Sequence, residues 1–284
     1  MTDTEKLDPR VHPYRDDLAA TYLRGRVNAA RFIDGVPCQI GSGFAAVKEE
    51  PSFEARQSTE LLFGETFTVL DERDGWAWGQ NGTDGYVGWL RVEALNADMT
   101  VPTHKVSALR TFVQPEPDLK LPFLDVLSMG ARVVVTGEQG DWRQIDGGGW
   151  VHARHMAPIA EDAPDFVAVA ERFVGTPYLW GGRTSIGIDC SGLVQLALLS
   201  AGVHCPRDSD QQAAAIGTLI SADGADVQYK RGDLVFFPGH VGIMTDAATL
   251  LHANAFHMQV VAEPLADVVA RAGAKGINAV KRPG

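Results

Sequence analysis

The sequence has little cysteine and no long apolar run. Its three cysteines, Cys38, Cys190 and Cys205, show no CxxC spacing, and such a sparse, odd set argues against a disulfide framework. No apolar stretch approaches the ~18 residues that a membrane-spanning helix needs. The first residues lack a basic stretch followed by an apolar one, so we expect no secretory signal. These absences predict a cytoplasmic protein with free thiols.

An excess of positive charge is also lacking. The formal net charge of the 284 residues is −11, whereas nucleic acids and anionic membranes select a basic face. We therefore expect neither nucleic acid nor membrane as a partner. The apolar content of 45% is that of an ordinary globular chain, and the length allows two or three domains.

Two segments of the first 160 residues repeat each other. Residues 64–76 align with residues 130–142, and residues 88–95 align with residues 149–156. Each copy contains a β-branched strand, a Gly/Asp turn, a strand that begins with Trp, and a Gly-Trp pair. Short strands with frequent turns predict small antiparallel barrels. The repeat resembles tandem bacterial SH3-like domains, which we place at residues 36–97 and 98–160.

The segment before the first barrel, residues 1–35, is mostly polar. Leu18, Ala19, Tyr22 and Leu23 form an i, i+4 apolar stripe within it. This stripe predicts one short helix over residues 15–26 that packs on its neighbours.

From residue 161 the pattern changes to helices followed by strands. Apolar periodicity and stop signals predict helices at residues 165–174, at 190–201, and from 208 or 209 to 217. Short apolar runs then predict strands at residues 234–237, 240–244, 249–252, 259–261 and 277–281. This order is typical of an α+β domain, which we place at residues 161–284.

Cys190 is the residue of this domain that most directly suggests chemistry. It lies in the motif Asp-Cys-Ser-Gly, where a glycine-rich loop turns into an apolar helix. A helix N-terminus favours the thiolate and lowers the thiol pKa, and its backbone amides are candidate oxyanion donors. Most lone cysteines are small buried apolar residues, but that role does not explain the polar neighbours. We therefore predict that Cys190 is a nucleophile.

A cysteine nucleophile needs a histidine base and a group that orients the base. His240 begins a predicted strand directly after Pro-Gly, and His252 lies on the next predicted strand. A hairpin of this length brings the two rings together, so we predict that His252 orients His240. Either histidine could instead be an ordinary polar residue at a strand end, and Asn254 and His257 remain alternatives for the orienting role.

In combination, three motifs resemble the NlpC family of papain-like cysteine peptidases over residues 165–282. They are Asp-Cys-Ser-Gly, Gly-Asp-Leu-Val-Phe-Phe followed by Gly-His-Val-Gly-Ile, and Leu-His-Ala. The resemblance implies a papain-like catalytic fold. Because a thiol nucleophile needs no Lewis acid, we expect neither a cofactor nor a metal. The resemblance also implies Cys190 as nucleophile, His240 as general base and acid, and His252 as the polar third member.

The order of domains resembles that of the γ-D-glutamyl-L-diamino acid endopeptidases of the dipeptidyl-peptidase VI type. This implies a free murein peptide, L-Ala-γ-D-Glu-diamino acid, as substrate and cell-wall peptide recycling as the role. By the same resemblance the first barrel narrows the cleft. Tyr86, Asp189 and either Glu60 or Glu65 would then hold the free amino terminus of the substrate.

Two serines complete the expected substrate contacts. Ser191 follows the nucleophile, and Ser209 lies in Pro-Arg-Asp-Ser, which resembles the segment that places a serine near the nucleophile. Cys205 stands just before this segment, where an aliphatic residue is usual, so we expect a small core residue there. The preferred diamino acid and the oligomeric state are left open by the sequence.

Other functions fit parts of the same sequence. A lysin that cuts intact peptidoglycan, with the barrels as wall anchors, would need export. A non-catalytic SH3-type binding protein would have no use for the cysteine and histidine pattern. A metal hydrolase could use Asp189, Cys190, His240 and His252, but these residues lack a recognised ligand spacing.

Overall fold

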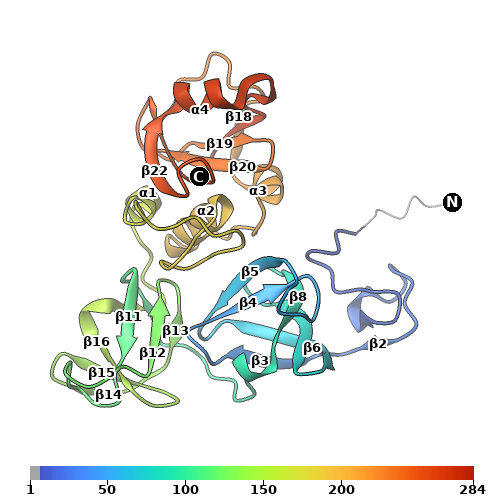
Figure 1. The fold of residues 1–284 in the computed structure, drawn as a ribbon, viewed down its shortest axis with the longest axis vertical. Helices are drawn as coiled ribbons and strands as arrows, with labels where there is room; N and C mark the ends of the chain where they lie inside the picture. Colours follow the sequence, from blue (N-terminus) through green and yellow to red (C-terminus); the bar gives the residue numbers. More distant parts are fainter. Residues whose placement is uncertain (1–6) are drawn as a thin grey trace. The chain divides into compact units, whose positions relative to one another are not determined.

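The computed structural model describes residues 7–284, apart from the side chain of residue 275. The chain divides into two compact units, Met1–Ile159 and Ala160–Gly284, which are drawn in Figure 1. The division falls one residue before the expected start of the catalytic domain.

The helix expected over residues 15–26 is not formed. The chain is extended through Leu18 and Ala20, which are buried beside three tryptophans of the first barrel. The ordered elements here are β1 (Ala19–Ala20), the 3₁₀ turn η1 (Thr21–Leu23) and β2 (Phe32–Ile33), with β1 and β2 paired in parallel. Tyr22, part of the expected stripe, is exposed. Packing of alternate residues against the barrel therefore overrides the weak helical periodicity.

Arg15 fastens this segment to the first barrel. Its guanidinium lies 4.3 Å from the ring centre of Trp78 and donates to Asp71 Oδ2 at 2.6 Å. The arginine thus combines a cation–π contact with an ion pair.

A seven-stranded antiparallel sheet follows, in the order β5-β4-β8-β7-β6-β3-β9. Alternate side chains of these strands, such as Leu61, Phe67 and Leu90, form a buried core. Asp74 and Gly75 both have positive φ, of 50° and 78°, so they form the two-residue hairpin turn that joins β6 to β7. The bounds are β3 Val36–Ile40, β4 Phe44–Lys48, β5 Gln57–Leu62, β6 Thr66–Arg73, β7 Trp76–Asn81, β8 Val87–Arg91, η2 Val92–Ala94 and β9 Leu95–Asn96.

The rest of the first unit is a second set of short strands. They form the sheets β13-β10-β17, β11-β12 and β14-β15-β16, which share a core that includes Val106, Leu127 and Val151. The bounds are β10 His104–Val106, β11 Arg110–Val113, β12 Asp125–Ser128, β13 Arg132–Val133, β14 Val135–Gln139, β15 Trp142–Ile145, β16 Trp150–His152, η3 Ala153–His155 and β17 Met156–Pro158.

The second unit combines helices with one antiparallel sheet, in the order β18-β23-β19-β20-β21-β22. The expected α+β class is therefore confirmed. The bounds are α1 Phe166–Glu171, α2 Cys190–Ser200, α3 Ser209–Ala215, β18 Thr218–Ser221, β19 Leu234–Phe237, β20 His240–Met244, β21 Thr249–Asn254, β22 Gln259–Pro264, α4 Leu265–Ala272, η4 Gly273–Lys275 and β23 Ala279–Arg282.

The helices of this unit cover the sheet from different sides. α2 packs against β20 and β21, and α4 packs against β22, as Figure 1 shows. Val235 and Phe237 of β19 share a core with Leu265 and Val268 of α4. Neither α4 nor β18 was expected from the sequence. Among the described residues, no helix is both long and apolar enough to cross a membrane.

Candidate active site

Cys190 is the first residue of α2, and a glycine-rich loop delivers the chain to it. Asp189 is the N-cap residue, and its Oδ1 accepts the N–H of Gly192 at 2.7 Å. A Cβ atom on Gly192 would collide with the carbonyl oxygen of Gly182. Gly192 therefore lets the loop pass close to the first turn of the helix.

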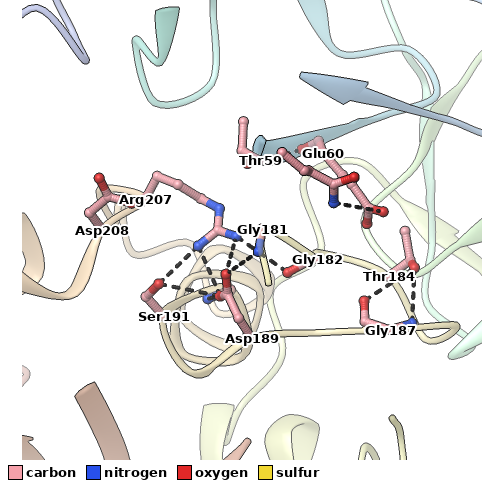
Figure 2. A network of polar contacts seen from close by, with 12 residues as sticks. Thr59, Glu60, Gly181, Gly182, Thr184, Gly187, Asp189, Ser191, Arg207 and Asp208 are labelled. Carbon is pink, nitrogen blue, oxygen red and sulfur yellow. Dashed lines mark hydrogen bonds and ion pairs between the residues drawn. The ribbon is translucent and has the colours of Figure 1, made fainter. Parts of the chain in front are cut away.

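Arg207 connects the glycine-rich loop to the start of α2 by hydrogen bonds. Its buried guanidinium donates to Asp189 at 3.0 Å (Oδ1) and 2.7 Å (Oδ2), and to Ser191 Oγ at 2.9 Å. Asp189 Oδ2 also accepts the N–H of Gly181 at 2.8 Å. Figure 2 shows this network, in which Arg207 reaches both residues that flank Cys190. The carboxylate of Asp189 is therefore paired with groups of its own unit. The substrate contact that we expected of Asp189 would have to add to these bonds.

Burial determines the protonation state of the Cys190 thiol. The side chain is buried, and this desolvation, followed by the neighbouring carboxylate of Asp189, raises the thiol pKa to about 12. Backbone N–H groups of Val241 and Ser191, together with Arg207, act in the opposite direction. The expectation that the helix N-terminus would lower this pKa is therefore wrong for the resting site, because desolvation outweighs the helix amides. At neutral pH Cys190 is a thiol.

The alkylation rate of Cys190 should report this state. Because only the thiolate reacts, modification by iodoacetamide should accelerate roughly tenfold per pH unit between about pH 7 and pH 10. The rate can be measured by mass spectrometry of the peptide that carries Cys190. In protein unfolded by urea the rate should level off near the ordinary thiol pKa of 9.0. A rate in the folded protein that is independent of pH between about 5 and 8 would instead show a preformed thiolate–imidazolium pair.

His240 and His252 are in direct contact, as the hairpin between β20 and β21 led us to expect. His240 Nε2 lies 2.8 Å from His252 Nδ1. Burial, followed by the neighbouring His252, lowers the pKa of His240 to about 3. Burial also lowers the pKa of His252. Both rings are therefore neutral at pH 7, and His240 keeps Nδ1 for a second partner.

Glu263 and Arg271 extend this pair, and neither was singled out from the sequence. His252 Nε2 lies 2.8 Å from Glu263 Oε1, and Arg271 Nη1 donates to Glu263 Oε2 at 2.9 Å. Hydrogen bonds from Arg271 and His252 hold the pKa of Glu263 at about 2 despite partial burial. A signal for α4 was present, because Leu265, Val268, Val269 and Ala272 follow the i, i+3, i+4, i+7 spacing of a helix face.

The two alternatives for the orienting role touch other members of the group. Asn254 Nδ2 lies 2.9 Å from His252 Nε2, and Asn254 Oδ1 accepts the N–H of His257 at 2.8 Å. His257 Nε2 lies 3.4 Å from Glu263 Oε2. Neither contact reaches His240, so the structure supports His252 for this role.

The expected substrate contacts fall in both units. In the second unit, Ser191 Oγ donates to Asp189 Oδ1 at 3.3 Å and Ser209 is the partly exposed first residue of α3. In the first unit, Tyr86 is buried just before β8. Glu65 Oε2 accepts the N–H of Leu62 at 2.9 Å.

Cys38, Cys190 and Cys205 are all free thiols, and Cys205 is fully buried. Within the described part of the chain, no three His, Cys, Asp or Glu side chains are grouped so that they could hold a metal ion.

Family models match both units. The model of the bacterial dipeptidyl-peptidase Sh3 domain matches residues 48–95, and that of the NlpC/P60 family matches residues 175–272. The first match lies in the seven-stranded sheet. The second contains α2 to α4. It also contains Cys190, both histidines, and the side chains bonded to them or to the loop before Cys190, which are Asp189, Ser191, Arg207, Asn254, Glu263 and Arg271.

Known proteins resemble the chain across both units. It is 35% identical to dipeptidyl-peptidase 6 of Lysinibacillus sphaericus over 233 residues, which are 72% of this chain and 83% of that protein. It is 29% identical to γ-D-glutamyl-L-lysine dipeptidyl-peptidase of Bacillus subtilis over 223 residues, 69% of this chain and 71% of that protein.

A solved structure shows the same fold. The crystal structure of an NlpC/P60 family protein from Bacillus cereus is similar with a TM-score of 0.72 and 19% identity, over 87% of this chain and 99% of that one. The loop-to-helix cysteine, the paired histidines and these similarities agree: the chain belongs to the NlpC/P60 family of cysteine peptidases and carries an SH3-like domain before its catalytic domain.

Proposed function

We propose that the protein is a cysteine peptidase in which Cys190 is the nucleophile and His240 the general base and acid. The observation that carries this proposal is the placement of a buried thiol at the N-terminus of α2, hydrogen-bonded by the backbone of Val241, the residue after His240. The second ring nitrogen of His240 is occupied by His252 at 2.8 Å. Cys190, His240 and His252 thus supply the nucleophile, the base and the group that orients the base.

The first half of the reaction forms a thioester. As Cys190 Sγ attacks the carbonyl carbon of the scissile amide, the thiol proton passes to His240 Nδ1. The tetrahedral oxyanion is stabilised by the backbone N–H of Cys190, the first residue of α2. Its collapse breaks the C–N bond, and the leaving amine takes the proton from His240.

The second half restores the enzyme. His240 Nδ1 takes a proton from water as the water oxygen attacks the thioester carbonyl. Collapse of this intermediate breaks the C–S bond, releases the acid product and returns the proton to the sulfur. Because the pair is neutral at rest, proton transfer accompanies attack rather than preceding it.

For the substrate, we propose a free murein peptide in which the bond between γ-D-Glu and the diamino acid is cut, as part of cell-wall peptide recycling. The printed names of the relatives from Bacillus subtilis and Lysinibacillus sphaericus, a γ-D-glutamyl-L-lysine dipeptidyl-peptidase and a dipeptidyl-peptidase, support this choice. A dipeptidyl-peptidase releases two residues from an unblocked amino terminus, so recognition of a free ammonium group belongs to the proposal.

The residues that we assign to substrate binding are those that the family resemblance implies. They are Tyr86, Asp189, Ser191 and Ser209 with an acidic partner. The resemblance leaves Glu60 and Glu65 as the two candidates for this partner. Both carboxylates are buried and both have partners inside the protein: Glu60 accepts from Gln57 at 3.5 Å and Glu65 accepts from the N–H of Leu62 at 2.9 Å.

Acetylation of the substrate amino terminus should reduce kcat/KM by at least about tenfold, because an acetylated nitrogen has no charge and cannot make the charge-assisted hydrogen bonds of a free ammonium group. The assay compares L-Ala-γ-D-Glu-meso-diaminopimelate with its N-acetyl form. Tyr86→Phe, which deletes one hydroxyl, should narrow the difference. Tyr22→Phe is the matched control, since the hydroxyl of Tyr22 is exposed and bonds only Gln80 among the contacts seen.

Intact sacculi provide the contrasting substrate. Under this proposal they should release no peptide, because the stem peptides are amide-linked to glycan. Equal cleavage of the acetylated peptide, or solubilised sacculi, would refute the free-peptide specificity and favour a lysin.

A further inference from the structure

A row of hydrogen-bonded groups leads away from His240 towards the edge of the sheet. It runs from His240 Nε2 to His252 Nδ1 at 2.8 Å and from His252 Nε2 to Glu263 Oε1 at 2.8 Å. Arg271 on α4 holds both oxygens of Glu263. The side chains of His252 and Glu263 are only 1% and 13% exposed, so water does not easily replace these contacts.

From this row we infer that Glu263 is a positioning residue that sets the tautomers of both histidines and thereby frees His240 Nδ1 to act as the base. The inference rests on the proposed function for its catalytic consequence. The tautomer assignment itself follows from the hydrogen-bond geometry.

The proton directions follow from the acceptor at the end of the row. An ionised carboxylate only accepts hydrogen bonds, so the proton of His252 must lie on Nε2. A neutral imidazole has one N–H, and His252 Nδ1 must then accept from His240 Nε2–H. His240 is left with an unprotonated Nδ1, which is the nitrogen that a base needs.

Asn254 favours the opposite arrangement, so Asn254 and Glu263 compete for His252 Nε2. Its Oδ1 is held by the N–H of His257 at 2.8 Å, so its amide N–H group faces His252 Nε2 at 2.9 Å. Asn254 alone would favour an unprotonated Nε2, which puts the protons of both rings on Nδ1. A hydrogen bond to a charged group is roughly twice as strong as a neutral one, so Glu263 outweighs Asn254.

Charged and titratable groups face the two histidines from every neighbouring element. Asp189 lies at the N-terminal end of α2, His257 lies in the turn after β21, and β22 and α4 supply the ion pair of Glu263 with Arg271. Arg271 opposes protonation of His252, whereas Glu263 favours it. The carboxylate is thus the group in this set whose removal tips the balance towards Asn254.

Glu263→Gln tests the inference without removing bulk. We expect imidazole ¹⁵N NMR spectra of the substrate-free protein to show Nε2–H tautomers for His240 and His252, and a shift towards Nδ1–H in the variant. The kcat for the free tripeptide should fall about tenfold with KM nearly unchanged. The amide that replaces the Glu263 carboxylate is neutral, so it no longer outweighs the neutral amide of Asn254 at His252 Nε2.

Two further variants separate positioning from a merely structural role. Glu263→Gln combined with Asn254→Asp replaces the opposing donor with an acceptor, so it should restore the Nε2–H tautomers and most of kcat. Glu171→Gln is the matched control, because Glu171 is paired with Arg231 in the same unit at 2.6 Å and does not contact the row. It should change neither the spectra nor kcat.

The spectra distinguish failure of this inference from failure of the proposed function. Unchanged tautomers in Glu263→Gln, with kcat equal to that of Glu171→Gln, would overturn the role of Glu263. A tautomer shift in a protein that hydrolyses no peptide would uphold the role of Glu263 in setting the tautomers and refute the peptidase proposal.

Discussion

Replacing Cys190 by alanine is expected to abolish peptide hydrolysis while leaving the fold intact. The loss should be at least about 10⁴-fold in kcat, a scale typical of a deleted nucleophile, because no other thiol lies in the second unit except the fully buried Cys205. Removing one sulfur atom from a buried site should destabilise the unit by no more than about 1–2 kcal/mol. Product release measured by mass spectrometry and thermal unfolding followed by circular dichroism would check both statements.

Cys205→Ala is the control for this experiment. It deletes the same atom from another buried site, where the thiol donates to the carbonyl oxygen of Pro206 at 3.4 Å. Its activity should match that of the parent protein. Residual turnover in Cys190→Ala above about 1% of the parent rate would assign the nucleophile elsewhere.

Much of the catalytic unit could be predicted from its sequence, because its strands are short apolar runs bounded by Gly, Pro and Asp. The strands expected at residues 234–237 and 240–244 have the bounds observed for β19 and β20. The helix that begins at Cys190 was also placed correctly. Local signals sufficed here because burial on both faces selects these residue types.

The prediction failed where packing between distant segments decides the structure. The stripe that begins at Leu18 has the i, i+4 spacing of a helix face, yet Leu18 and Ala20 are buried in an extended segment. Their partners there are Trp76, Trp78 and Trp89 of the first barrel. No local pattern reveals those tryptophans as partners. α4 was missed for a different reason. Its apolar face has helical spacing, but the helix begins directly after β22, with no turn residues between them to mark its start.

The candidate site shows the same division. The contact between His240 and His252 followed from the length of the hairpin, whereas the ion pair of Glu263 with Arg271 depends on α4 folding back over β22. The direction of the Cys190 pKa shift was misjudged because a helix N-terminus is visible in sequence and desolvation is not. The motifs and the contact between the two histidines could therefore be predicted from the sequence, whereas the ion pair and the effect of burial on the thiol pKa could not.

His240→Ala is expected to reduce kcat by about 10²- to 10⁴-fold, the usual range for loss of a general acid–base group. His240 is the residue whose free ring nitrogen can take the thiol proton, since its other nitrogen is held by His252 at 2.8 Å. His252→Ala should cost less, roughly 10- to 10²-fold, because it leaves the base in place and removes only the group that orients it. Single-turnover rates with the free tripeptide would give both values.

The order of the two effects is what the proposed roles require. His257→Ala is the matched control, because this ring lies 3.4 Å from Glu263 and does not contact His240; its rate should stay within about threefold of the parent. Added imidazole should partly restore His240→Ala, because a small base can enter the space left by the ring, and it should not restore Cys190→Ala. If His252→Ala lost more activity than His240→Ala, the two histidines would have to exchange roles. His240 would then be the orienting group, and the hydrogen-bond row from Glu263 would pass through the base, His252, instead of ending at it.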